Sequence, residues 1–185
     1  MKIRQLLAIV FGTTIIYRAY KEIYESIFFE AFIWILLILI GATLLSISIF
    51  KDYKNYKQNK KLINFSSSFL IVGFTIITMA ILIKTELNFD KPTLIAAYHD
   101  DDVGGVYIDF KTDGSYILAS TAIGYSNYSY GTYKISGNRI TLNKIPDQYI
   151  TSCHLEIVPN ENGKERFMKE ISGYNFTFTV KEDNR

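Results

Sequence analysis

Two long apolar segments constrain this chain more than any other feature. The segment Leu62–Ile83 contains no charged side chain over 22 residues, and Ile27–Phe50 contains only Glu30 over 24 residues. As helices they would rise about 33 Å and 36 Å, more than the roughly 30 Å hydrocarbon core of a bilayer. Two buried helices of a soluble bundle would each need a polar face, which scattered Ser and Thr do not supply. We therefore predict two membrane spans, 27–50 and 62–83.

The amino-terminal segment is shorter. Its apolar stretch Gln5–Tyr17 holds 13 residues, flanked by basic residues on both sides. This length is typical of a signal-peptide core or an interfacial helix, and no Ala-x-Ala-like cleavage site follows. We predict that residues 1–26 form an amphipathic helix along the membrane interface, with a short tilted third span as the alternative.

Basic residues give conflicting signals about orientation. The connector Lys51–Lys61 carries five lysines, which the positive-inside rule places in the cytoplasm, with the carboxy-terminal half then outside. The basic residues before the first span favour a cytoplasmic amino terminus instead. With two spans, that arrangement puts the carboxy-terminal half in the cytoplasm. Both orientations stay open at this point.

Small residues occur where the two spans can approach each other. They are Gly41, Ala42, Ser46 and Ser48 in the first span, and Ser66, Ser67, Ser68 and Gly73 in the second. Such residues let helices pack closely, either within one chain or between copies of it. Glu30, near a helix end, is expected to reach the lipid headgroups.

Charge and hydrophobic period both change near Lys91. Residues 1–90 carry 10 basic and 6 acidic side chains, whereas residues 91–185 carry 10 basic and 12 acidic ones. From Thr93 onward, apolar and polar residues alternate between turns that contain glycine. We predict eight strands, near 93–99, 105–110, 115–123, 125–136, 139–145, 148–158, 164–171 and 174–181.

Eight antiparallel strands of this size favour a soluble up-and-down β-barrel, lipocalin-like in shape, with a β-sandwich as the alternative. The chain therefore divides into residues 1–26, a two-helix membrane region over 27–90, and a barrel over 91–185. The predicted fold class is a membrane α-helical hairpin joined to an all-β domain.

Candidate catalytic and metal-binding groups are weak. His99-Asp100-Asp101-Asp102 lacks the ligand spacing of a calcium loop and is expected to form a solvated turn. Cys153 is the only cysteine, and the side chain of neighbouring His154 should point to the opposite face of a strand. We predict no enzyme activity, no metal site and no cofactor.

Aromatic and basic residues combine on one predicted strand face. Tyr128 and Tyr130 share a face with Thr132 and Lys134, and Arg139 lies just across the next turn. Aromatic rings next to cations can stack bases and neutralise phosphates. Packing of the rings is the simpler explanation. We predict that a ligand is bound by Tyr107, Tyr128, Tyr130, Thr132, Lys134 and Arg139.

Two spans followed by a compact barrel in 185 residues resemble the two-transmembrane, β-strand-rich effectors of CBASS, the bacterial cyclic-oligonucleotide antiphage system. The likeness covers the segments 27–50, 62–83 and 93–181. It implies a multi-pass protein of the bacterial inner membrane whose cytosolic barrel binds a cyclic dinucleotide made by a partner nucleotidyltransferase.

In that family, ligand binding promotes homo-oligomerisation of the helices, which disrupts the bilayer and kills the infected cell. No DNA or RNA polymer is an expected partner. The lysine-rich connector departs from this topology, because it would face outward. Two alternatives remain: a membrane-anchored extracytoplasmic binding module, such as a toxin-immunity protein, and a solid barrel that only stabilises the hairpin.

Overall fold

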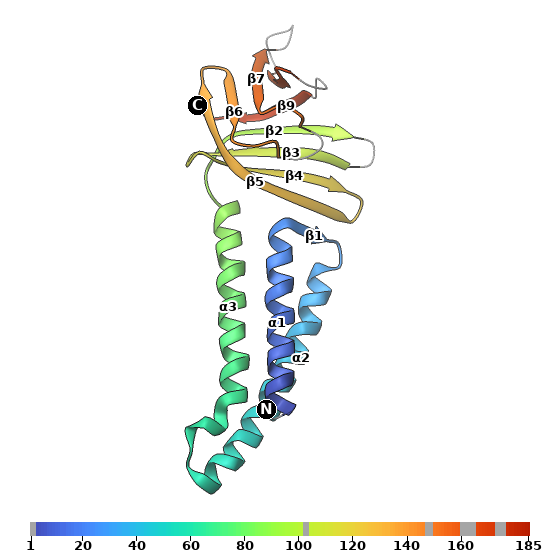
Figure 1. Cartoon of the computed structure of the whole chain (residues 1–185). Coiled ribbons are helices and arrows are strands. Elements are labelled where there is room, and N and C mark those ends of the chain that lie inside the picture. The colour runs from blue at the N-terminus through green and yellow to red at the C-terminus, as the bar shows by residue number, and fades with distance from the viewer. Residues whose placement is uncertain (1–2, 102–103, 147–149, 160–165, 173–176) are drawn as a thin grey trace. The chain divides into compact units, whose positions relative to one another are not determined.

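The computed structural model describes residues 3–101, 104–146, 150–159, 166–172 and 177–185 (Figure 1). The chain divides into two compact units. The helical unit comprises Met1–Ile23 and Ile27–Glu86, and the barrel unit comprises Tyr24–Ser26 and Leu87–Arg185.

The described part of the helical unit contains three α-helices, which can be followed in Figure 1. They are α1 (Ile3–Tyr24), α2 (Glu30–Asn59) and α3 (Ser66–Phe89), and the 3₁₀-helix η1 (Leu62–Phe65) precedes α3. Helix α1 runs antiparallel to α2, because its first turn contacts the last part of α2 and its last turns contact the start of α2. The first turn of α3 also meets the last part of α2.

Two of these helices are long and apolar enough to cross a membrane, Glu30–Asn59 and Leu62–Phe89. Both expose large apolar side chains. Ile38 of α2 is 65% exposed and Phe69 of α3 is 64% exposed. An apolar surface of this extent suits lipid contact far better than water. The predicted pair of membrane-length helices is confirmed.

Helix α2 continues beyond the predicted span, through most of the lysine-rich connector. Lys51–Asn59 is helical, so the connector is not the loop that the sequence predicted. Two interactions one turn apart favour the helix, with the ammonium groups of Lys57 and Lys60 lying 5.0 and 5.5 Å from the ring centres of Tyr53 and Tyr56. The helix ends at Asn59, and the residue that caps it, Lys60, adopts a left-handed conformation with φ of 56°.

A glycine of α1 lies against a ring of α3. A Cβ atom at Gly12 would lie 2.0 Å from the ring of Phe74 in α3. Ser48, Ser67 and Ser68 are buried, in keeping with the small-residue packing expected for the spans. Gly73 differs, because a Cβ atom there would meet nothing within 4 Å. Gly12 therefore lets α1 pack closely against α3, in addition to the contacts between α2 and α3.

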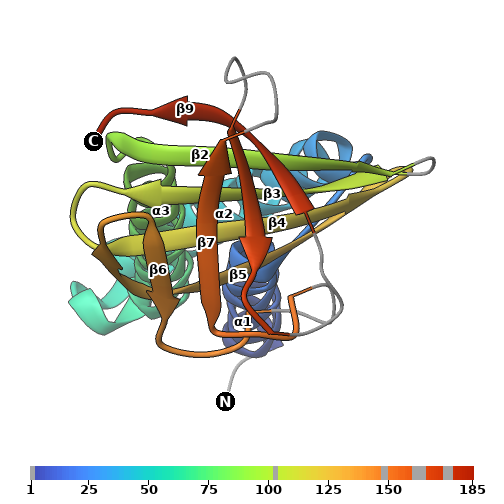
Figure 2. The same cartoon turned by 90° about the horizontal axis from the view of Figure 1, so that it is seen from above.

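Eight antiparallel strands close into an up-and-down barrel in the second unit (Figure 2). They are β2 (Thr93–Asp101), β3 (Gly104–Lys111), β4 (Ser115–Ala122), β5 (Tyr125–Ser136), β6 (Arg139–Leu142), β7 (His154–Pro159), β8 (Arg166–Glu170) and β9 (Thr177–Asp183). Each strand pairs with the next along the chain, and β9 pairs with β2. The short strand β1 (Glu25–Ile27) adds to the sheet beside β5.

The barrel confirms the predicted fold class, and a sandwich is excluded. Strand β5 has the predicted bounds, whereas β6 ends three residues early, at Leu142. The predicted strand 148–158 begins only at His154, and residues 147–149 lie outside the described part. His99–Asp101 continues β2 rather than forming a turn, because it pairs with Gly104–Val106 of β3. Asp102 lies outside the described residues.

Apolar side chains fill the inward positions of the barrel. Phe110, Tyr116 and Phe178 are fully buried, and the rings of Phe110 and Tyr133 lie 4.8 Å apart, edge to face. Aliphatic side chains such as Ile108 complete the same cluster. The inside of the barrel is thus a packed apolar core over these positions.

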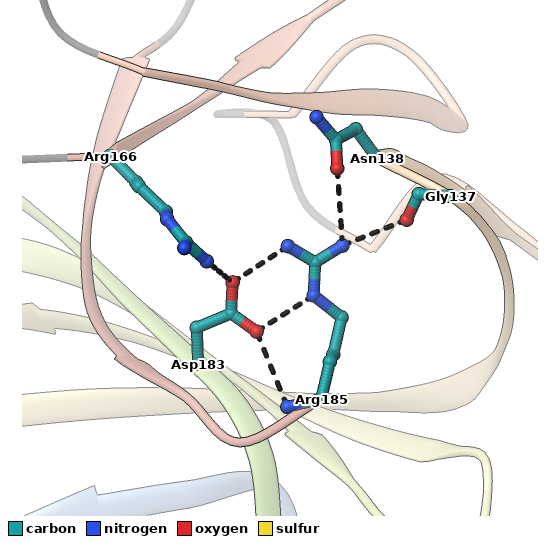
Figure 3. A network of polar contacts seen from close by, with 5 residues as sticks. All are labelled: Gly137, Asn138, Arg166, Asp183 and Arg185. Carbon is teal, nitrogen blue, oxygen red and sulfur yellow. Dashed lines mark hydrogen bonds and ion pairs between the residues drawn. The ribbon is translucent and has the colours of Figure 1, made fainter. Parts of the chain in front are cut away.

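A polar network ties the end of β9 to the β5–β6 turn (Figure 3). Asp183 accepts hydrogen bonds from Arg166 at 2.5 Å and from Arg185 at 2.7 Å, and Arg185 donates to the carbonyl of Gly137 at 2.8 Å. Hydrogen bonds from Arg185, supported by Arg166, lower the pKa of Asp183 to about 2. The network holds this end of the barrel together.

Candidate functional site

The predicted ligand-binding residues lie on the outside of the barrel. Tyr133 of β5 points inward and is 9% exposed. Because side chains alternate along a strand, Tyr128, Tyr130, Thr132 and Lys134 share the outward face. The prediction that these four residues share one face agrees with this register, but the face is not the barrel interior.

Tyr128 and Tyr130 pack against aromatic residues of the same unit. Phe89, the last residue of α3, lies 5.3 Å from the ring of Tyr128 and 6.4 Å from that of Tyr130. Tyr24 lies 6.1 Å from Tyr130, also edge to face. Burial raises the pKa of Tyr130 to about 12. These rings hold the chain segments that enter and leave the helices against β5.

The remaining predicted residues lie at different distances from these two tyrosines. Lys134 lies six positions along β5 from Tyr128, a separation of about 20 Å. Arg139 is exposed and faces Glu156 across the strand pair, with Nε 3.5 Å from Oε1. Tyr107 lies on β3 in the same cross-strand row as Tyr128, with the small side chain of Ala119 on β4 between them. The six residues form an extended strip rather than an enclosed pocket, and ligand binding by them stays a prediction.

A buried lysine links strand β3 to the end of α3. The ammonium group of Lys111 donates to the carbonyl oxygens of Phe89 at 2.8 Å and Lys91 at 2.9 Å. It also forms an ion pair of 2.7 Å with Asp109, which lies two positions earlier on the same face. Lys111 is 2% exposed. A cation at this position satisfies carbonyl groups that the helix end leaves unpaired.

Only one carboxylate oxygen of Asp109, the ion-pair partner of Lys111, has hydrogen-bond partners among the described residues. Asp109 Oδ2 accepts a hydrogen bond of 3.2 Å from Thr93, whereas Oδ1 is buried and has no hydrogen-bond partner among the described residues. The sequence places Lys111 in a turn, and nothing in the spacing revealed this role. The available signal is a lysine and an aspartate at alternate positions on one face of a mostly apolar strand.

The helical unit contains a cavity of about 590 Å³ between its three helices. Most of its lining is apolar, but Glu22 of α1 and Glu86 of α3 lie at one end. Trp34 Nε1 donates a hydrogen bond of 2.9 Å to Glu22. Glu30 pairs with Arg18 of α1, and its predicted contact with the headgroups stays a prediction. None of these carboxylates was singled out as a site from the sequence.

The neighbouring residues Cys153 and His154, considered as a pair from the sequence, lie at the start of β7. His154 is exposed, and its Nδ1 lies 3.4 Å from the hydroxyl of Thr141 on the neighbouring strand. Cys153 lies just before β7, partly buried against the barrel core. Within the described ranges, no group of three or more His, Cys, Asp and Glu residues is placed to hold a metal ion.

Comparisons with protein-family models, curated proteins and solved structures give no significant match.

Proposed function

We propose that this chain is a membrane effector in which the barrel receives a ligand and the helices respond. The observation that carries the proposal is the set of contacts between Lys111 and the last carbonyls of α3. Together with the contact between the rings of Tyr128 and Phe89, they connect the outer face of β3–β5 to the last residue of a membrane-length helix. Ligand binding on that face would therefore alter the contacts of the helix end.

The resemblance to CBASS effectors supplies the finer form of the proposal. The ligand is then a cyclic dinucleotide made by a neighbouring nucleotidyltransferase, and the response is homo-oligomerisation and disruption of the bacterial inner membrane. Tyr128 and Tyr130 offer rings for the bases, and Lys134 and Arg139 offer cations for the phosphates. Tyr107 and Thr132 complete the proposed contact strip.

Competition for one aromatic ring gives this effector a physical mechanism. A base that stacks on Tyr128 competes with Phe89, whose ring already lies 5.3 Å away. Release of Phe89 would free the last turn of α3. Ligand binding shifts the equilibrium only as far as its affinities for the two states differ. The released state would then be the one that assembles.

Vesicle leakage tests this proposal on the full chain. Cyclic dinucleotides added to vesicles that contain the protein should release an entrapped dye, and calorimetry on the detergent-solubilised chain should show binding. Arg139→Ala and Lys134→Ala should weaken binding, whereas Lys169→Ala, which changes an exposed lysine on β8, should not. Absence of binding across a panel of cyclic dinucleotides would refute the ligand.

A second function is favoured by the course of α1. This helix has 22 residues, rises about 33 Å and lies antiparallel to α2, so Arg4 and Asp52 meet at one end. If α1 also crosses the membrane, the basic amino-terminal residues and the lysines of 51–61 share one side. The positive-inside rule then places the barrel outside the cytoplasm, as an anchored binding module such as an immunity protein.

A topology measurement separates the two functions. Two reporter enzymes are fused after Arg185, one active only in the cytoplasm and one active only in the periplasm. If the barrel senses a cytosolic messenger, only the cytoplasmic reporter should be active. If α1 lies along the interface and the barrel is cytosolic, exposed Lys54 faces the outside of the cell. A cysteine introduced in its place should then react with a membrane-impermeant thiol reagent. An active periplasmic reporter, with Lys54→Cys protected in intact cells, would support the extracytoplasmic module instead.

A further inference from the structure

The cavity of the helical unit has a long apolar body and an acidic end. We propose that it binds a phospholipid whose headgroup carries a primary ammonium group, with Glu22 and Glu86 holding that ammonium. This proposal is independent of the ligand of the barrel, because the lining residues all belong to the helical unit.

The body of the cavity suits an alkyl chain. Its volume of about 590 Å³ lies within the range of about 300–1,000 Å³ usual for small-molecule sites. The apolar lining comes from all three helices and includes Phe11, Ile15, Leu37, Leu45 and Ile71. Between apolar helices in a bilayer, such a space favours hydrocarbon over water.

The acidic end lies near the helix ends, where headgroups would be. Glu22 is two residues before the end of α1, and Glu86 is three residues before the end of α3. Trp34, close to the start of α2, lines the same end of the cavity. Tryptophan is enriched at the depth of lipid headgroups, which assigns this end of the cavity to the interface.

Charge complementarity selects the headgroup. Arg18, a basic residue of the last turns of α1, is paired with Glu30. Among the described residues, neither Glu22 nor Glu86 has an ion-pair partner within 4 Å, and Glu22 is held in place by the hydrogen bond from Trp34. Carboxylates that line an otherwise apolar cavity are stabilised by a counter-charge, which a cationic headgroup at the interface can supply.

A primary ammonium fits these carboxylates better than other common headgroups. It supplies three N–H donors, so it can bind both Glu22 and Glu86. A quaternary ammonium of the choline type carries the same charge but has no N–H to donate. An anionic glycerol headgroup would be repelled. The site should therefore distinguish phosphatidylethanolamine from phosphatidylcholine with identical acyl chains.

The cavity contains its own reporter. Trp34 is the only tryptophan in the chain and lines the acidic end. The full chain is placed in phosphatidylcholine vesicles, and phosphatidylethanolamine with brominated acyl chains, which quench tryptophan fluorescence, is added in steps. Quenching should be half complete at a mole fraction about tenfold lower than with brominated phosphatidylcholine, as expected for charge-assisted hydrogen bonds.

Four variants make the test specific. Glu22→Gln and Glu86→Gln should each remove most of the headgroup preference, and Glu182→Gln, an exposed acidic residue of the barrel, should leave it unchanged. Ala42→Phe should fill the cavity and lower retention of all lipids in native mass spectrometry. Circular dichroism verifies that the helices of each variant are folded.

Three results would overturn the proposal. The first is equal quenching by the two brominated lipids, which would mean that the acidic end does not distinguish the two headgroups. The second is unchanged lipid retention in folded Ala42→Phe. The third is a cavity occupied by a helix of a second copy, in which case Ala42→Phe changes the oligomeric state and leaves bound lipid unaltered.

Discussion

Arg4 Nη1 lies 2.6 Å from Asp52 Oδ1, and this ion pair joins the first turn of α1 to the last part of α2. The same carboxylate accepts hydrogen bonds from the backbone N–H and hydroxyl of Ser68 in α3, at 3.3 and 2.8 Å. Asp52 is fully buried. One carboxylate therefore connects all three helices at one end of the helical unit.

We predict that Asp52→Ala lowers the free energy of unfolding of the helical unit by about 3 kcal/mol, because it leaves Arg4 and Ser68 without their shared acceptor. Thermal unfolding in detergent, followed by Trp34 fluorescence, measures the change. Lys54→Ala, at an exposed position on the same helix, is the matched control. Equal unfolding temperatures for the two variants would contradict the role assigned to Asp52.

We predict opposite outcomes for two glycine substitutions. Gly12→Ala places a methyl group 2.0 Å from the Phe74 ring and should lower the free energy of unfolding by about 2 kcal/mol. Gly73→Ala meets open space and should leave it unchanged or raise it by up to about 1 kcal/mol, since alanine favours helix. Thermal unfolding of both variants in detergent checks this, and destabilisation by Gly73→Ala would argue against the packing described.

We predict that Lys111→Met destabilises the barrel by about 3 kcal/mol, because Asp109 loses its counter-charge and the carbonyls of Phe89 and Lys91 lose a donor. The near-ultraviolet circular dichroism of the barrel tyrosines during chemical unfolding measures it. Lys134→Met, an exposed lysine on β5, should change stability by less than about 0.5 kcal/mol. If both substitutions had the same effect, Lys111 would have no special structural role.

The barrel should lose stability in acid through Asp183. Its folded pKa of about 2 lies below the ordinary value of 3.8, so its contribution is present above about pH 4 and is lost as the pH falls towards 2. Because Arg166 is 58% exposed and screened by solvent, we expect only about 1 kcal/mol. Asp183→Asn should be less stable than the unaltered chain at pH 7 and equally stable near pH 2.

Unfolding by guanidinium at a series of pH values checks this difference. Glu182→Gln, at the adjacent exposed position, serves as the control and should leave the pH profile unchanged. An Asp183→Asn profile parallel to that of the unaltered chain would show that the network of Asp183, Arg166 and Arg185 contributes nothing.

Strand alternation predicted most of the barrel because each strand has one face in the core. In β5, Tyr133 and the outward residues around it could be assigned to opposite faces from spacing alone. Where alternation weakens, the predicted strand bounds were wrong. Strand β6 ends at Leu142 rather than at residue 145, and β7 begins at His154 rather than at residue 148. His99–Asp101 looks like a polar turn, but backbone pairing with β3 keeps it extended.

Features that depend on distant contacts could not be predicted. The lysine-rich connector is polar enough for a loop, yet burial of Asp52 against α1 and α3 keeps it helical. Gly12 carries no signal in the sequence, because its importance comes from Phe74 on another helix. Lys111 follows the predicted strand 105–110 and precedes Thr112-Asp113-Gly114, a turn pattern that conceals both its place in β3 and its contact with the end of α3.

Closure of the barrel through β9 and β2 has a consequence for biosynthesis. Ile95 pairs with Asp183, so the seam joins the earliest and latest strands of the barrel to leave the ribosome. Until then the nascent chain carries an open sheet with two unpaired edges, a surface that readily joins edges of other chains. Chaperone protection of this intermediate should matter most until β9 has emerged and paired with β2.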